Sequence, residues 1–541
     1  MIQKIYKFIS SIMKSILTDR AERNFIRHNK VLFNNSQNKD NQILIEIHTL
    51  QPNYMPISHF SKVLSKIYDA QLVGYKPRIQ FNFFNKFKSY ILTFKAKKIF
   101  NSFGVNRFLN YNINDYKTLA NRLTNKLMSE INSKSDLINL IVDDIWVGDL
   151  IYDQYLASNE TPTVDIKSDE LRKILYEFSI LYYYWKDLFS KKNVKALVVS
   201  HTCYFMGLSG RIAIGFDIPV YQTNLHGVYY LSNKNLFPYS EFHSYKNDFE
   251  KLDIEKKKNG IANARKRLRL IFEGSTNVDQ PYIKNSAYHQ KKTSKRILGN
   301  KKNIKILIAS HSFYDSPNGL GKTLFPDFYE WLEFIGELSN KTDYEWYIKT
   351  HPAIGIRDKN TIEDFVLRYK KIILIRDTIS HHQLIEEGIN IVLTVHGSIG
   401  IEYAAKNITV INASLNNPHI SYDFNIHPKS KEELKNIIFN LDSYVNANLF
   451  SEDVYKCYYM KFLHYNDNAF FSDFDSAMSQ MGGYYSLFSS NIYNQWIDYL
   501  TPDIQSKIEL NLKKFVLSKE YKIKPLSYQR SRRHPSYEQM F

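Results

Sequence analysis

The run of residues 391–412 constrains what this chain can fold into more than any other stretch. An apolar, β-branched segment ends at His396, Gly397 and Ser398 form a turn, and a short Ala-rich helix leads to a second β-branched segment. Strand, helix and strand in this order predict a βαβ unit with parallel strands. The turn would present backbone N–H groups and the Ser398 hydroxyl to a phosphate, and Glu402, one helical turn further on, could reach a ribose. The sequence therefore predicts a nucleotide pocket.

The same alternation of strand and helix is repeated upstream of this run. Strands are predicted at residues 304–309, 344–349 and 372–375, and helices at residues 324–338, 361–369 and 381–387. The strands end in polar residues, among them His311, the pair His351 and Pro352, and His396. Ligands of an open parallel sheet bind beyond the carboxyl ends of the strands, so we expect these residues to converge on one crevice. The alternative is that polar residues follow most strands because loops are polar.

The N-terminal half shows a second α/β pattern. Strands are predicted at residues 42–47, 70–74, 196–200 and 219–222, and helices at residues 58–68 and 208–214. The predicted fold is therefore α/β, with two Rossmann-like domains that face each other across a cleft. The predicted parts are an amphipathic basic segment at 1–40, a first domain at 41–250, a basic connection at 251–303, a second domain at 304–480, and C-terminal helices with a basic tail at 481–541.

Composition excludes several classes of protein. The chain has 541 residues, of which 44% are hydrophobic, enough for two or three folded domains and too many for a disordered chain. Cys203 and Cys457 are the two cysteines and stand far apart, so neither a disulfide framework nor a zinc site is expected. No stretch approaches the roughly 18 uncharged apolar residues of a membrane-spanning helix. A cytoplasmic location is predicted.

A formal net charge of +18 is compatible with nucleic acid, a membrane surface or an anionic substrate as partner. The sequence has no zinc-finger spacing, no aromatic RNA-binding signature and no strong helix-turn-helix pattern, so no nucleic-acid partner is expected. The first 17 residues place Lys4, Lys7 and Lys14 opposite an apolar face. That pattern suits a helix lying on the anionic surface of the inner membrane, and it suits equally a helix packed on its own domain.

Four segments together resemble bacterial surface-carbohydrate glycosyltransferases. They are ILIASH at 306–311, LFPDFYEWL at 324–332, IKTHP at 348–352 and TVHGSIGIEY at 394–403. The chain is similar to the capsular polysaccharide biosynthesis group, which includes Kdo transferases, and to bacterial sialyltransferases with a His-Pro motif. The resemblance implies a GT-B fold in which His351, Pro352, Gly397 and Ser398 bind the nucleotide of an activated sugar, with Glu402 near its ribose.

Glycosyl transfer needs stabilisation of the departing phosphate and a base for the acceptor hydroxyl. Helix N–H groups and histidines such as His311 and His396 can stabilise the phosphate, so a metal-independent enzyme is expected. For the catalytic group on the first domain, the sequence offers Asp149, Asp153 and His201. Asp149 follows a glycine at a predicted helix entrance, which fits a base exposed to the cleft or a helix cap. His201 fits a base or a strand-end histidine with satisfied hydrogen bonds.

Three further residues are predicted to bind substrate. Asn416 and His419 follow the last predicted strand, where an irregular turn is the alternative, and His226 follows a strand of the first domain. In place of the Gly-rich Thr-Gly-type loop expected in the resembled family, the chain runs ASLNNPH, which leaves the donor sugar open.

The predicted function is sugar transfer from a CMP- or UDP-sugar, the co-substrate in place of any cofactor, to a growing capsular or other surface glycan or glycolipid. A nucleotide-sugar 2-epimerase or a polyol-phosphate transferase on the same scaffold is one alternative. A basic nucleic-acid-binding protein is the alternative from a different class.

Overall fold

The structure is a computed structural model that describes most of the chain. The described residues are 16–33, 39–48, 51–78, 83–276, 286–288, 292–300, 302–350, 355–445, 452–464, 468–471 and 489–526. The predicted nucleotide ligands His351 and Pro352 lie outside these ranges, as do residues 1–15 of the amphipathic segment and the end of the basic tail.

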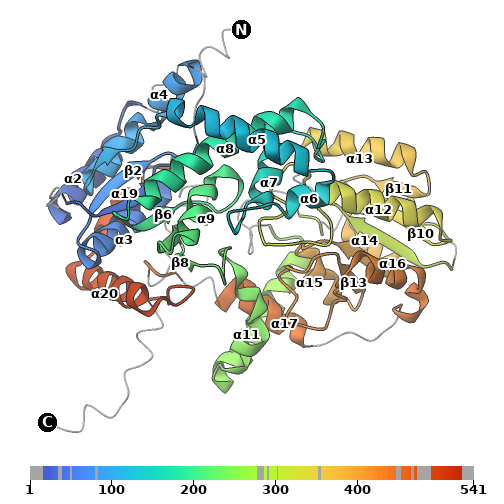
Figure 1. The fold of residues 1–541 in the computed structure, drawn as a ribbon. Helices are drawn as coiled ribbons and strands as arrows, with labels where there is room; N and C mark the ends of the chain where they lie inside the picture. Colours follow the sequence, from blue (N-terminus) through green and yellow to red (C-terminus); the bar gives the residue numbers. More distant parts are fainter. Residues whose placement is uncertain are drawn as a thin grey trace, which may run out of the picture.

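Two mainly parallel sheets organise the two halves of the chain (Figure 1). The first sheet has the order β3-β2-β1-β6-β7-β8, in which β8 runs antiparallel to β7, and the second has the all-parallel order β11-β10-β9-β12-β13. Both orders reverse direction beside their first strand, as in a Rossmann-like domain. The predicted α/β class with two Rossmann-like domains is confirmed. The strands are β1 (Gln42–Glu46), β2 (Gln71–Tyr75), β3 (Val105–Phe108), β6 (Val194–Val199), β7 (Val220–Thr223), β8 (Val228–Leu231), β9 (Lys305–Ala309), β10 (Glu345–Lys349), β11 (Ile372–Ile375), β12 (Ile391–Thr394) and β13 (Thr409–Asn412), with a separate hairpin of β4 (Ile141–Val142) and β5 (Ile145–Trp146).

Apolar cores cover both faces of each sheet. In β1, Leu44 packs into one core cluster while Ile43 and Ile45 pack into another, because successive side chains of a strand point to opposite faces. In β9, Leu307 packs into one core cluster while Ile306 and Ile308 pack into another. Strands buried on both faces read as continuous apolar runs, which is why sequence alone located all strands of the two sheets except β3 and β8. The helices are α2 (Arg20–Leu32), α3 (Tyr54–Ile67), α4 (Phe83–Ser102), α5 (Lys117–Glu130), α6 (Lys134–Ile138), α7 (Gly148–Asn159), α8 (Asp169–Ser190), α9 (Leu208–Gly215), α10 (Tyr245–Glu250), α11 (Ile254–Phe272), α12 (Phe328–Asn340), α13 (Ile356–Arg368), α14 (His381–Glu386), α15 (Ile399–Ala404), α16 (Lys431–Phe439), α17 (Asp453–Tyr458), α19 (Ile492–Tyr499) and α20 (Pro502–Ser518).

The predicted elements match the observed ones to within a few residues. Strand β11 has the predicted bounds, and the helix predicted at 324–338 begins at Phe328. Its start is fixed by Asp327, whose side chain accepts a hydrogen bond from the N–H of Glu330 and caps the helix. The predicted basic connection at 251–303 contains α11, whose Ala264 and Leu268 pack in one cluster with α17.

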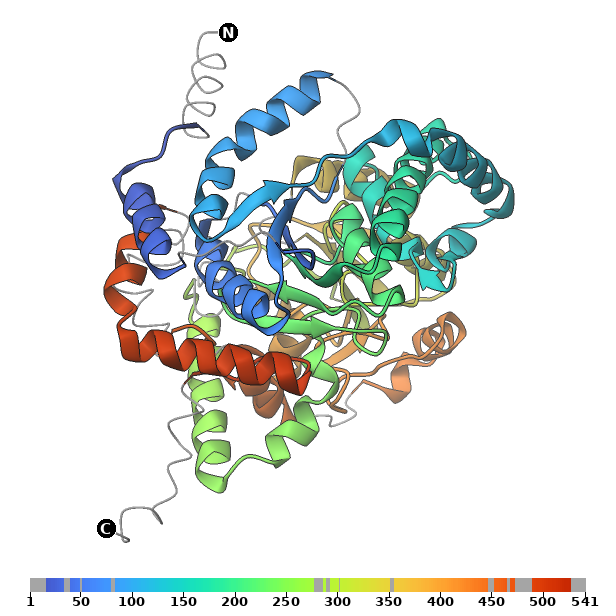
Figure 2. The same ribbon diagram turned by 60° about the vertical axis from the view of Figure 1, so that its left-hand side comes forward.

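The last described segments return to the N-terminal domain (Figure 2). Helix α19 lies beside α2, where the rings of Phe25 and Tyr493 stack at 4.4 Å, and α20 lies beside α3. Near residue 523 the backbone pairs with β8, since the N–H of Ile523 donates to the carbonyl of Val228 at 3.0 Å. The described residues 468–471 also pack in this N-terminal core. After the second sheet, the chain thus returns to the domain of the first sheet. The predicted domain limits stay a prediction.

Candidate functional site

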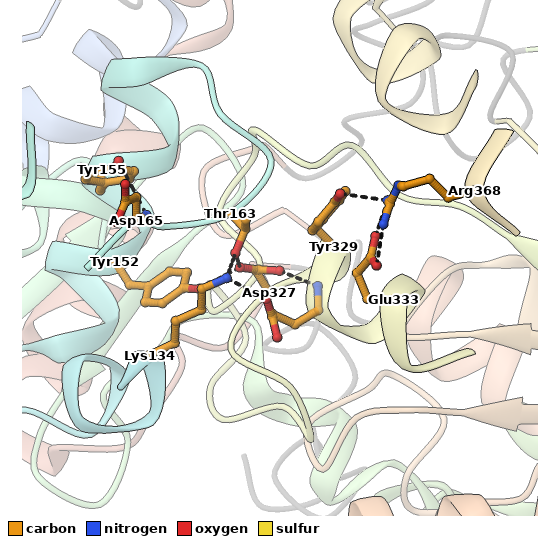
Figure 3. A network of polar contacts seen from close by, with 10 residues as sticks. Lys134, Tyr152, Tyr155, Thr163, Asp165, Asp327, Tyr329, Glu333 and Arg368 are labelled. Carbon is orange, nitrogen blue, oxygen red and sulfur yellow. Dashed lines mark hydrogen bonds and ion pairs between the residues drawn. The ribbon is translucent and has the colours of Figure 1, made fainter. Parts of the chain in front are cut away.

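Helix α7 and the loop before α12 hold the two domains together. The hydroxyl of Tyr152 donates to the carboxylate of Asp327 at 2.5 Å, and the hydroxyl of Thr163 donates to the same oxygen at 2.7 Å (Figure 3). Lys134 of the first domain forms an ion pair with Glu330 of the second beside this contact. Asp327 is buried, which raises its pKa, and it also caps α12. One carboxylate therefore fixes the start of α12 and the position of the first domain against it.

The two aspartates predicted as catalytic groups both lie on α7, and both are buried. Asp149 is 2% exposed, and the terminal nitrogens of Arg211 donate to its two oxygens at 3.2 and 2.8 Å. The predicted exposure of Asp149 to a cleft is therefore wrong, because the first turn of α7 faces the domain interior. The cap alternative is wrong as well, since Val147 occupies the cap position and no side chain caps this helix. A catalytic role for Asp149 stays an untested prediction.

Asp153 contacts the other domain. It is 2% exposed, and the side-chain amide of Asn318 donates to its Oδ1 at 2.8 Å. Burial raises the pKa of Asp153 well above its usual value, and the neighbouring charge of Asp149 adds to the rise. The carboxyl thus lies at the contact between the domains, where its protonated form is favoured.

The carboxyl edge of the first sheet carries a carboxyl group that sequence reasoning missed. Glu46 ends β1 and is 2% exposed, and Ser200, just after β6, donates to it from its N–H at 2.8 Å and its hydroxyl at 2.6 Å. Burial raises the pKa of Glu46 to about 7, against the lowering effect of the bonds from Ser200. An acidic residue that ends the otherwise apolar strand QILIE was the available signal.

His201 lies at the same edge and is exposed to solvent. Its Nδ1 accepts a hydrogen bond from the N–H of Cys203 at 3.2 Å, so the neutral ring carries its proton on Nε2. Burial by surrounding protein atoms lowers the pKa of His201, and the charge of Asp315 opposes this. Of the three predicted catalytic residues, His201 is the one that solvent reaches freely.

A pocket of about 360 Å³ lies on the first domain next to this edge. Tyr204 lines it, and its hydroxyl donates to Asp315 of the second domain at 3.0 Å. The pocket therefore borders the contact between the domains. Arg78, at its rim, pairs with Glu177 at 3.4 Å. The lining residues are Arg78, Gln154, Ala157, Ser158, Tyr204 and Met206.

The carboxyl edge of the second sheet brings together the histidines that follow β9 and β12. The ring centroids of His311 and His396 lie 5.0 Å apart, as predicted from the convergence of strand ends. The N–H of Val395 donates to Nε2 of His311 at 3.1 Å, which places the proton of the neutral ring on Nδ1. Burial, with a smaller contribution from the positive charge of Lys461, lowers the pKa of His396 to about 4, and the charge of Asp315 opposes this change.

The predicted phosphate and ribose ligands bind each other in this structure. The hydroxyl of Ser398 donates to Oε1 of Glu402 at 3.0 Å. Burial raises the pKa of Glu402, while the bond from Ser398 and the charge of Lys461 lower it. Gly397 sits at the turn, where its N–H donates to the hydroxyl of Thr394 at 3.3 Å.

The three residues predicted to bind substrate lie in different surroundings. His419 is fully buried against Gly400, where a Cβ atom would lie 2.5 Å from its ring, so only glycine fits there. The amide oxygen of Asn416 accepts a hydrogen bond from Nε2 of His243 in the first domain, at 3.1 Å. His226 lies in the turn after β7, in the first domain. His419 is an electrostatic neighbour of His396.

Lys461 is a second residue that sequence reasoning missed. It lies on a π-helical turn, Tyr459–His464, which directly follows α17. The turn packs against α15, since Met460 lies in one apolar cluster with Ile401 and Ala404. The charge of Lys461 accordingly lowers the pKa of both His396 and His419. No sequence signal points to it, because no recognisable motif connects Lys461 with the βαβ unit that ends at residue 412.

Two absences hold for the part of the chain that the structure describes. Within it, no three His, Cys, Asp or Glu side chains gather as a metal site. No helix there combines the length and apolar character needed to cross a membrane.

Comparisons with known proteins extend to structures but not to sequences. The chain matches no protein-family model and no curated protein sequence. KpsC from Thermosulfurimonas dismutans, a β-Kdo 2,4 transferase, is similar at 13% identity and a TM-score of 0.33 over 57% of this chain and 88% of that chain. UDP-GlcNAc 2-epimerase from Neisseria meningitidis, bound to UDP-GlcNAc, is similar at 11% identity and a TM-score of 0.20 over 78% of this chain and 96% of that chain. A glycosyltransferase from Rickettsia africae is similar at 12% identity and a TM-score of 0.22 over 86% of this chain and 100% of that chain. At these scores no activity of this chain follows from the likenesses.

Proposed function

We propose that the protein is a glycosyltransferase that moves a sugar from a nucleotide-activated donor to an acceptor hydroxyl. The observation that carries this proposal is the meeting of His311 and His396 at the point where the strand order of the second sheet reverses. Ligands of open α/β sheets bind at this point. Since His396 stays neutral, its ring can bind a phosphate oxygen without a charge to desolvate.

The donor is proposed to lie on the second domain and the acceptor on the first. Ser398 and Glu402 exchange a hydrogen bond that a ribose or phosphate could replace, which suits the donor side. The pocket beside Tyr204 offers about 360 Å³ at the edge of the domain contact, which suits a saccharide unit of the acceptor. Two substrates held on facing domains are the arrangement that a transfer reaction requires.

His201 is the proposed catalytic residue of the first domain. It is the exposed member of the predicted set, and it lies at the sheet edge close to Asp315 of the second domain. Asp149 and Asp153 remain weaker proposals, because each is buried and already paired. A CMP- or UDP-sugar as donor, a capsular or other surface glycan as acceptor, and work at the inner membrane surface are the finer parts of the proposal.

Thermal-shift measurements with CMP, UDP, GDP and CDP test the proposal first. One nucleotide should raise the melting temperature in proportion to the logarithm of its concentration, because ligand binding stabilises the folded state by mass action. His396→Ala should lose the shift. His28→Ala should keep it, since His28 is a partly buried histidine on α2 of the first domain.

The matching nucleotide sugar then tests the reaction. Release of free nucleotide that depends on an added glycan acceptor supports transfer. Conversion of the sugar without any acceptor would identify an epimerase instead. Absence of any nucleotide shift together with tight, steeply salt-dependent DNA binding would replace the proposal by the nucleic-acid alternative.

A further inference from the structure

Lys461 carries a charge that the described protein does not neutralise. Its side chain is partly buried, and within the described ranges it forms no ion pair and donates no hydrogen bond. Its ammonium group makes a cation–π contact with the ring of Phe462, whose centroid is 4.9 Å from Nζ. Removing an ammonium group from water without a counter-ion is unfavourable. A partly buried lysine without a counter-ion therefore suggests that an anionic ligand binds beside it.

Two buried imidazole nitrogens close to Lys461 also lack a partner. The Nε2 of His419 and the Nδ1 of His396 are buried and form no hydrogen bond to any described residue. The side-chain amide of Asn425 faces Nδ1 of His419 at 3.3 Å and donates to it, so the neutral ring carries its proton on Nε2. His419 therefore presents a buried N–H donor with no acceptor, an arrangement that folded proteins rarely tolerate.

Among the described residues, Glu402 is the one carboxyl group that could serve as the counter-ion. It is an electrostatic neighbour of Lys461, but it forms no ion pair with that lysine and accepts its hydrogen bond from Ser398. Burial also raises the pKa of Glu402, which disfavours the charged form that Lys461 would need. Lys461 therefore has no ion-pair partner among the described residues. A π-helical turn, which places Lys461 here, is a local distortion often found at functional sites.

We infer that Lys461, the Nε2–H of His419 and the ring of His396 form a binding site for the phosphate group of the donor. The inference rests on the proposed function, since it names the group of the nucleotide that this edge binds. A phosphate oxygen accepts from both the ammonium and the imidazole N–H, and its charge neutralises Lys461. The π-helical turn after α17 is thereby a part of the nucleotide site, although it lies outside the βαβ unit.

Inorganic pyrophosphate and the nucleotide selected by the thermal-shift screen are the two probes, titrated by calorimetry. Lys461→Met should weaken both by about tenfold or more, because a charge-assisted contact is lost. Lys461→Arg should keep most of the affinity. Lys456→Met is the matched control, since this nearby lysine pairs with Asp453 at 2.8 Å and should leave both affinities unchanged.

Stability separates a binding role from a structural one. Lys461→Met should leave the melting temperature of the free protein unchanged or raise it, because it removes a charge without a counter-ion. A lower melting temperature with wild-type affinity for both probes would overturn the inference. So would equal affinity of the wild type for the nucleotide and its nucleoside.

The same titrations distinguish this inference from the proposed function. Nucleotide binding that is insensitive to Lys461→Met refutes the phosphate site and leaves the proposed function standing. Lysine-dependent pyrophosphate binding without use of any nucleotide sugar supports the anion site and refutes the transferase. No binding of either probe to the wild type refutes both.

Discussion

The carboxyl edges of the two sheets share one topology but differ in how their polar groups are satisfied. At the first sheet, Glu46 accepts two hydrogen bonds from Ser200. At the second sheet, His396 and His419 each bury a ring nitrogen without a described partner, next to Lys461. The buried carboxyl group of the first edge thus has partners within the protein, whereas two buried ring nitrogens of the second edge have none among the described residues. Strand order indicates where a ligand can bind, and the unsatisfied ring nitrogens beside a lysine are why the phosphate is proposed to bind at the second edge.

The largest expected effect tests whether the first domain uses its buried charges for stability. Asp149→Ala should lower the free energy of unfolding by about 3–5 kcal/mol, because Arg211 would stay buried without its partner. Urea unfolding measures this loss, while nucleotide affinity of the folded protein should stay normal. The double variant Asp149→Ala with Arg211→Met should regain much of the stability, since no unpaired charge remains.

The opposite pattern would restore Asp149 as the base predicted from sequence. Asp149→Asn would then unfold at the wild-type urea concentration and lose on the order of a hundredfold in turnover. Such a result would also mean that the first edge, like the second, holds groups for the reaction and not for the fold.

Glu46 gives the next largest effect, and its sign follows from its raised pKa. Below the ordinary value of 4.5 the carboxyl is protonated in the folded and unfolded states, and between 4.5 and about 7 the unfolded chain alone loses the proton. Wild-type stability should therefore fall as pH rises through this window. Glu46→Gln cannot titrate, so its stability relative to wild type should rise by up to about 3 kcal/mol between pH 4.5 and 8.

Unfolding curves at several pH values check this expectation. Glu363→Gln, at an exposed position of α13, should follow the wild-type pH dependence. Parallel curves for Glu46→Gln and wild type would show that Glu46 is ionised in the folded protein. The first edge would then hold a buried negative charge, and its contrast with the second edge would sharpen.

The sequence predicted what depends on neighbours in the chain. The second sheet, the four central strands of the first, and the meeting of His311 with His396 follow from apolar runs whose ends must converge in a parallel sheet. The edge strands β3 and β8 of the first sheet were missed. The Gly-Asp pair that begins α7 located a helix start but could not tell which side of its first turn faces inward. That side is fixed by Arg211, which lies 62 residues further on in the chain.

Lys461 shows the same limit at the second edge. The residue follows a helix that packs with α11 and α15, so its place beside His396 depends on contacts between distant segments. Glu46 was within reach of local reasoning, because a carboxyl at the end of a buried strand is unusual. Its pairing with Ser200 was not, since that bond joins residues 154 apart.

Ser398→Ala tests the second edge with a moderate effect on binding and little on stability. The variant should weaken nucleotide binding by about 1–3 kcal/mol, since it removes the hydroxyl that bonds Glu402 and is proposed to bind phosphate. His351→Ala, predicted from sequence alone, should behave in the same way. Ser430→Ala is the control, because Ser430 caps α16. This variant should lower the free energy of unfolding by about 1 kcal/mol without changing nucleotide affinity. Calorimetry showing wild-type affinity in both Ser398→Ala and His351→Ala would move the nucleotide away from the βαβ unit.

The smallest expected effect is that of a chelator, which should leave transfer unchanged. Magnesium and manganese bound to a diphosphate are commonly held by several protein carboxylates, and the second edge gathers a single carboxyl group, Glu402, with an ammonium, imidazoles and a hydroxyl. A lysine and neutral N–H donors can balance the leaving phosphate by themselves. Initial rates with EDTA should therefore equal those with added magnesium. If EDTA abolishes transfer and magnesium or manganese restores it, the positive charge at this edge is supplied by a cation, and Lys461→Met should then affect the rate far less than removal of the metal.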